Sequence, residues 1–158
     1  MITPKKKADM PADFLERVWN ESMTHVKTVV DMVSEPFLML DMDLSVVAAN
    51  EAYYEMFKYI RKDVEGKSLY ALGSGEWDTA SLRAKLSKVS EHEGFFSGFQ
   101  MTIKAKSVGS KTLILNARNI QTKGVPGDSG LLYSMILLAM EDITEMVLIA
   151  AGIRKNLL

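Results

Sequence analysis

Apolar residues recur at steps of three and four positions along the first part of the chain. This spacing places them on one face of an α-helix, because such a helix turns once in about 3.6 residues. The stripe consists of Leu15, Trp19, Met23, Val26, Val30 and Val33. Pro36 disfavours helical geometry in the residue before it, so an amphipathic helix is predicted over residues 12–34, after a polar tail at 1–11.

A hairpin and a second helix are predicted next. Two short apolar runs, at residues 37–40 and 44–49, flank a polar turn at 41–43, which is typical of paired strands. Asn50 follows the second run, where its side chain can accept a hydrogen bond from a free backbone N–H group at the start of a helix. The inward face of this helix is predicted to consist of Ala52, Tyr53, Met56, Phe57 and Ile60.

The second half of the chain changes from helical to strand periodicity. A helix that starts after the capping residues 78–79 ends near Gly94. Three long strands follow, at residues 95–106, 111–120 and 131–143. A last apolar helix begins near residue 145. Helices and strands do not alternate regularly, so the predicted fold class is α+β with an antiparallel sheet.

Composition and charge narrow the possible functions. The net charge of -1 over 158 residues does not suggest a nucleic-acid partner. The chain has no cysteine, which excludes disulfides, thiol catalysis, cysteine-ligated zinc and covalent cysteinyl-flavin chemistry. No apolar run reaches the roughly 20 residues that span a bilayer, so we expect a cytoplasmic location and no membrane contact by this segment.

Three segments resemble parts of a PAS domain. Residues 36–53 are similar to the opening hairpin of the family and the asparagine that starts its first helix, and residues 64–69 are similar to its usual glycine-containing turn. Residues 136–145 contain Asp142-Ile143-Thr144, which resembles the signature where PAS domains continue into a linker helix. A fourth segment, residues 73–78, resembles a variant seen in PAS domains of bacterial signalling proteins, histidine kinases among them.

The resemblance implies a fold and a division of the chain. The fold is a five-stranded antiparallel sheet with short helices on one face and flanking N- and C-terminal helices. The PAS domain would occupy residues 35–144, and residues 145–158 would begin a C-terminal linker helix. No phosphoacceptor histidine segment or ATP-binding motif follows Thr144, so we expect the chain to be a fragment of a larger sensor.

The resemblance also implies a function. A PAS module would sense a small ligand in an internal cavity and relay the signal through flanking helices in a homodimer, to an effector such as a histidine kinase in a bacterial two-component system. The signal relay would comprise Asp142, Ile143 and Thr144, and the apolar stripe of residues 12–34 would form the dimer interface. The alternatives are a ligand-free dimerisation or adaptor module and, from another class, a small-molecule enzyme.

Candidate cavity residues are those whose apolar or amide side chains are predicted to face the interior. They are Tyr54, Phe57, Leu69, Trp77, Leu82, Leu86, Phe99, Met101, Leu113, Leu115, Asn116, Met135 and Leu137. Most of them can equally be packed core, because protein interiors are normally filled.

Known cofactor classes find little support in the sequence. The two histidines, His25 and His92, lie outside the predicted cavity or at a helix end beside carboxylates, which disfavours haem ligation. Non-covalent flavin would need partners such as Trp77, Asn116 and Asn119, for which core and strand-end roles are simpler. We therefore expect a small metabolite or no ligand. Catalytic motifs such as a nucleophile triad or a phosphate-binding loop are missing, so no enzyme activity is expected.

Overall fold

The computed structural model describes residues 35–91, 94–123 and 132–156. The predicted helix over residues 12–34, with its apolar stripe, and both histidines lie outside these residues. Among the described residues, no helix is long and apolar enough to cross a membrane.

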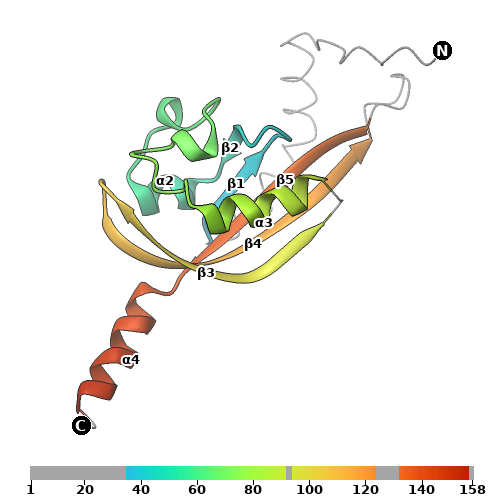
Figure 1. Cartoon of the computed structure of the whole chain (residues 1–158). Helices are drawn as coiled ribbons and strands as arrows, with labels where there is room; N and C mark the ends of the chain where they lie inside the picture. Colours follow the sequence, from blue (N-terminus) through green and yellow to red (C-terminus); the bar gives the residue numbers. More distant parts are fainter. Residues whose placement is uncertain (1–34, 92–93, 124–131, 157–158) are drawn as a thin grey trace, which may run out of the picture.

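The elements follow the predicted order (Figure 1). They are β1 (Phe37–Leu40), β2 (Val46–Ala49), α2 (Glu51–Phe57), η1 (Arg61–Asp63), η2 (Leu69–Ala71), α3 (Ala80–Glu91), β3 (Phe95–Ala105), β4 (Gly109–Lys123), β5 (Leu132–Asp142) and α4 (Thr144–Asn156). The α+β class is confirmed.

One antiparallel sheet of five strands, in the order β2-β1-β5-β4-β3, organises the domain. The first and last strands are therefore neighbours, and Leu38 lies opposite Leu138. The Met140 N–H group donates to the Pro36 carbonyl at 3.0 Å. The start of β1 and the end of β5 consequently lie side by side.

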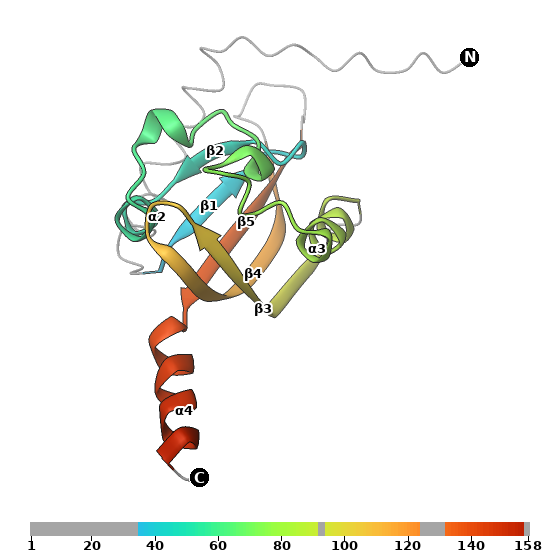
Figure 2. The same ribbon diagram turned by 60° about the vertical axis from the view of Figure 1, so that its left-hand side comes forward.

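The core fills the space between one face of the sheet and the helices, while α4 projects away from it (Figure 2). The sheet contributes alternate residues of each strand, such as Leu113 and Leu115 of β4 and Ile136 and Leu138 of β5. The helical segments contribute residues such as Phe57, and all of these side chains are buried. The predicted arrangement of short helices on one face of a five-stranded antiparallel sheet is confirmed.

Asn50 fixes both the start of α2 and the start of β1. Its side-chain oxygen accepts hydrogen bonds from the backbone N–H groups of Tyr53 at 3.1 Å and Phe37 at 3.0 Å. Its amide nitrogen donates to the Glu35 carbonyl at 2.8 Å. The predicted helix cap is confirmed, and the same side chain also joins two segments that are distant in sequence.

Helix α2 ends earlier than the sequence pattern predicts. Lys58 adopts a left-handed conformation, with a φ of 57°, which stops the helix after Phe57. Ile60 therefore leaves the helical face and is 53% exposed. The prediction that Ile60 faces inward is wrong for this reason.

Candidate functional site

Most of the predicted cavity residues meet in the core. Those that are buried are Phe57, Leu69, Trp77, Leu82, Leu86, Met101, Leu113 and Leu115. Phe99 is half-buried and packs against them. They come from both layers of the domain, so the structure brings these nine side chains to one region.

Four predicted cavity residues lie elsewhere. Met135 and Leu137 alternate with the core residues of β5 and therefore face the opposite side of the sheet. Asn116 is exposed, and its side chain accepts a hydrogen bond from the Gly98 N–H group at 2.9 Å. Tyr54 packs only at the margin of the core, and its hydroxyl donates to Glu65 at 3.4 Å.

Two polar atoms lie inside this core, one on the predicted cavity residue Trp77 and one on Tyr53, which the cavity prediction omitted. The Tyr53 hydroxyl and the Trp77 indole nitrogen are buried, and neither makes a well-formed hydrogen bond to any described residue. Burial raises the pKa of the Tyr53 phenol, and the nearby Trp77 N–H group partly opposes this rise. An unsatisfied buried polar group costs about 1–3 kcal/mol of stability, so this pair is a departure from normal core chemistry.

Aromatic rings surround the Tyr53 and Trp77 pair. The Phe57 ring centroid lies 4.8 Å from that of Tyr53 and 5.8 Å from that of Trp77. Tyr59 stacks on Phe57, with 6.2 Å between the centroids. The helical register set by the Asn50 cap explains the cluster, because it turns Tyr53 and Phe57 inward together.

The turn that carries Trp77 is fastened to this aromatic cluster. The Tyr59 hydroxyl donates to one carboxylate oxygen of Glu76 at 2.7 Å, and the Ser74 N–H group donates to the other, also at 2.7 Å. Gly73 passes directly beside these groups with a φ of 58°, and a β-carbon there would collide with Tyr59 and Glu76. The turn thus depends on a glycine at this position.

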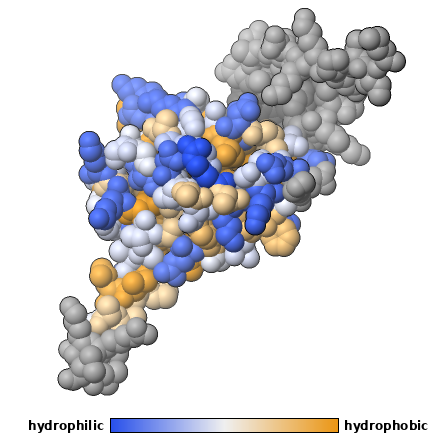
Figure 3. Space-filling model, viewed as in Figure 1, coloured by the Kyte–Doolittle hydropathy of each residue, from blue (hydrophilic) through white to orange (hydrophobic). Residues whose placement is uncertain are grey.

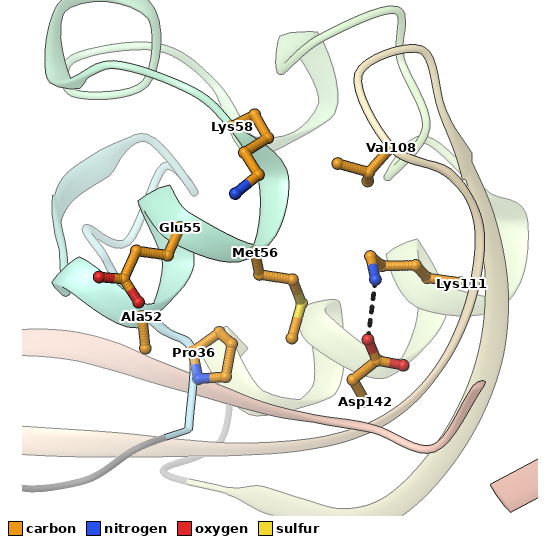
Figure 4. Close-up of a pocket in the computed structure, with 8 residues that line it drawn as sticks. All are labelled: Pro36, Ala52, Glu55, Met56, Lys58, Val108, Lys111 and Asp142. Carbon is orange, nitrogen blue, oxygen red and sulfur yellow. Dashed lines mark hydrogen bonds and ion pairs between the residues drawn. The ribbon is translucent and has the colours of Figure 1, made fainter. Parts of the chain in front are cut away.

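A surface groove of about 500 Å³ lies beside α2, outside the buried core. Its walls come from four parts of the chain, and Figure 4 shows Met56 extending into it opposite the pair formed by Lys111 and Asp142. The lining residues are Pro36, Ala52, Glu55, Met56, Lys58, Val108, Lys111 and Asp142. Of this set, the sequence analysis proposed a functional role only for Asp142, because residues so far apart in sequence give no local signal of a shared groove.

The predicted relay residues form a junction between β4, β5 and α4. The Thr144 hydroxyl accepts a hydrogen bond from the Thr112 N–H group at 2.9 Å and donates to the Asp142 carboxylate. The Ile143 N–H group donates to the Thr112 carbonyl at 2.9 Å, and Lys111 pairs with Asp142 at 2.9 Å. The first residue of α4 is therefore attached directly to strand β4.

The charge of Asp142 contributes to this junction. Burial alone would raise the pKa of Asp142, but hydrogen bonds from Thr144 and Lys111 outweigh burial and lower it. A carboxyl whose pKa is lowered on folding stabilises the folded state above its ordinary pKa of about 3.9. This contribution is lost as the pH falls through the lower, folded value.

Comparison with known proteins identifies the fold family. Residues 30–104 match the family model described as the PAS fold. No curated protein matches the chain.

Solved PAS domains share the architecture at low sequence identity. The PAS domain of an HTR-like protein from Haloarcula marismortui is 14% identical with a TM-score of 0.56, over 81% of this chain and 97% of that chain. The PAS domain of BvgS from Bordetella pertussis is 16% identical with a TM-score of 0.59, over 88% and 100%.

A third PAS domain belongs to the nitrogen regulation protein NR(II) from Vibrio parahaemolyticus. It is 17% identical with a TM-score of 0.57, over 75% of this chain and 97% of that chain.

At such identities the likeness concerns the fold alone. Together with the family match, it shows that this chain has the PAS fold, a fold found in sensory modules of signalling proteins.

Proposed function

We propose that this chain senses a small molecule in the interior of residues 35–144 and relays its presence through the flanking helices of a homodimer. Residues 145–158 would begin the connector to an effector such as a histidine kinase, in a cytoplasmic bacterial two-component system. The observation that carries the proposal is the direct attachment of α4 to strand β4 at the junction of Thr112, Asp142 and Thr144.

This junction supports a short physical path from the core to α4. Leu113 is fully buried in the core, and it immediately follows Thr112 in β4. Thr112 bonds through its N–H group to Thr144 and through its carbonyl to Ile143. A ligand that displaces Leu113 would therefore move the first turn of α4, provided that it binds the two positions of β4 with different affinity.

Replacing Thr144 with valine is expected to loosen this attachment. The valine removes the acceptor of the Thr112 N–H group and the donor to Asp142 while keeping a similar volume. We expect the Thr112 amide to exchange its hydrogen about tenfold faster, as the loss of one hydrogen bond implies. Hydrogen exchange followed by nuclear magnetic resonance measures this rate.

Thr102→Val is the matched control for Thr144→Val. The Thr102 hydroxyl lies 3.1 Å from the Thr112 hydroxyl and makes no contact that supports the Thr112 backbone. Its replacement should leave the exchange of the Thr112 amide nearly unchanged. Equal exchange rates in the two variants would argue against a junction held by Thr144.

The exposed apolar side chains of α4 support a second copy of the chain as the dimer partner. Met146 and Leu148 are 65% and 66% exposed, and Val147 and Ile149 are also exposed. Figure 3 shows the orange patch that they form where α4 leaves the sheet. Paired amphipathic helices bury such surfaces, and a helix shared by two copies can transmit a displacement.

A native mass spectrum of the freshly purified chain tests ligand and dimer together. We expect a dimer whose mass exceeds twice that of the denatured chain, because a bound small molecule is retained. The double variant Leu148→Lys and Ile149→Lys should weaken the dimer about tenfold or more, since each lysine adds a charge to the apolar contact. Ile60→Lys, a change at an exposed apolar residue far from α4 in sequence, is the control.

The outcomes separate the proposed sensor from its alternative. A dimer without extra mass would favour the ligand-free adaptor module. A wild-type monomer at micromolar concentration would contradict the proposed dimer. Equal weakening by Ile60→Lys would contradict the assignment of the contact to α4.

A further inference from the structure

The buried Tyr53 and Trp77 pair has the chemistry of a binding site rather than that of a packed core. An indole N–H group can only donate a hydrogen bond, whereas a phenol can both donate and accept. The two side chains lie in one aromatic cluster, because both rings pack against Phe57, with centroids 4.8 Å and 5.8 Å from it. The Trp77 N–H group and the Tyr53 O–H group are both donors, and neither has a partner among the described residues. The pair therefore lacks an acceptor.

The surroundings restrict what that acceptor can be. Every described member of the core cluster is apolar or aromatic, and Asn50 is the only polar residue among the buried ones that the structure describes. Asn50 already makes three hydrogen bonds. An anion would thus be buried without a compensating cation, which is strongly unfavourable. An uncharged acceptor group fits, and the adjacent Phe57 ring favours an aromatic body.

We propose that Tyr53 and Trp77 form the recognition point for an uncharged aromatic ligand that carries a hydrogen-bond acceptor, such as a carbonyl oxygen. This inference rests on the proposed sensory function and specifies its ligand class. Trp77 is the buried residue at the end of a turn whose preceding residues, Gly73 to Glu76, are all partly or fully exposed. The ligand would reach Tyr53 and Trp77 through an outward movement of this turn.

Binding of three fluorinated probes to the full chain tests the proposal. They are para-fluoroacetophenone, which is uncharged with an acceptor, para-fluorocumene, which has the same shape without an acceptor, and para-fluorobenzoate, which is charged. Fluorine magnetic resonance measures each dissociation constant. We expect the ketone to bind about tenfold more tightly than the cumene, as one buried hydrogen bond implies, and the benzoate not to bind.

Two neighbouring tyrosines provide matched variants. Tyr53→Phe should weaken the ketone about tenfold and leave the cumene unchanged, because only the buried donor is lost. It should not lower the melting temperature of the free protein, since the removed hydroxyl has no partner there. Tyr54→Phe, whose hydroxyl faces Glu65, should bind all three probes as the wild type does.

The possible results are distinguishable. Three results would overturn the inference. They are ketone binding that Tyr53→Phe leaves unchanged, benzoate binding as strong as ketone binding, and no binding of the ketone at millimolar concentration. A resident water molecule between the two side chains would produce the last of these results. The proposed sensory function would survive any of them if the native spectrum still showed a retained small molecule, and would fail separately if it did not.

Discussion

Replacing Asn50 with alanine is expected to lower the free energy of unfolding by about 3 kcal/mol. The side chain is 5% exposed, and it satisfies the N–H groups of Phe37 and Tyr53 and the carbonyl of Glu35. Alanine leaves all three groups without their partner, including the Tyr53 N–H group whose bond caps α2, and each such loss is worth about 1 kcal/mol. Equilibrium unfolding in urea measures the change.

Two further variants make the Asn50 prediction specific. Asn50→Asp keeps the acceptor for both N–H groups but loses the donor to Glu35, so an intermediate loss is expected. Asn116→Ala removes an exposed amide that accepts one hydrogen bond, from Gly98, and should cost about 0.5 kcal/mol. A loss for Asn50→Ala no greater than that for Asn116→Ala would refute the structural role of Asn50.

Replacing Gly73 with alanine is expected to cost about 2–3 kcal/mol. The left-handed backbone, with a φ of 58°, accounts for about 1 kcal/mol when a β-carbon is added. The remainder arises because the β-carbon would push Tyr59 and Glu76 apart and break the hydrogen bond that fastens the Trp77 turn. The same urea titration reports the loss.

Gly109→Ala separates these two contributions. Gly109 also has a left-handed backbone, with a φ of 80°, but no atom lies within 4 Å of its added β-carbon. We expect a cost of about 1 kcal/mol from the backbone alone. If the two glycine variants lose the same stability, the contact between Gly73 and the pair of Tyr59 and Glu76 contributes nothing.

Periodicity was sufficient to predict the elements of the domain. The strands β3 and β4 alternate apolar and polar residues, so their inward faces, including Met101, Leu113 and Leu115, were predicted correctly. Asn50 was recognised as a cap because it follows an apolar run. These features depend on residues within a few positions of one another, which is the range over which sequence patterns are informative.

The inward face of β5 could not be found in this way. Residues 135–140 are all apolar, so alternation does not distinguish one face from the other. The face follows from pairing with β1, which places Leu138 opposite Leu38 and turns Met135 and Leu137 outward. A contact between the first and last strands has no signature in a single sequence.

The list of predicted cavity residues included Tyr54, although the helical pattern had placed Tyr53 on the inward face. Once Asn50 is accepted as the cap, the inward positions three and seven residues later are Tyr53 and Phe57. The cap and the inward position of Tyr53 were both predicted from the sequence, and the structure confirms them. The sequence did not predict that the Tyr53 hydroxyl and the Trp77 indole nitrogen lie together without partners. Their arrangement depends on the path of the turn after η2.

The pairing of β1 with β5 has a consequence for how this domain can be combined with others. The chain enters the sheet at Pro36 and leaves it after Met140, and these two residues are joined by a backbone hydrogen bond. A unit whose two connections emerge at neighbouring points can be inserted into a host protein with little disturbance of the host. Because β1 and β5 are paired, a small sliding of β5 along β1 would change the distance between the two connections. Segments attached before Pro36 and after Met140 would then both be displaced by one movement inside the domain.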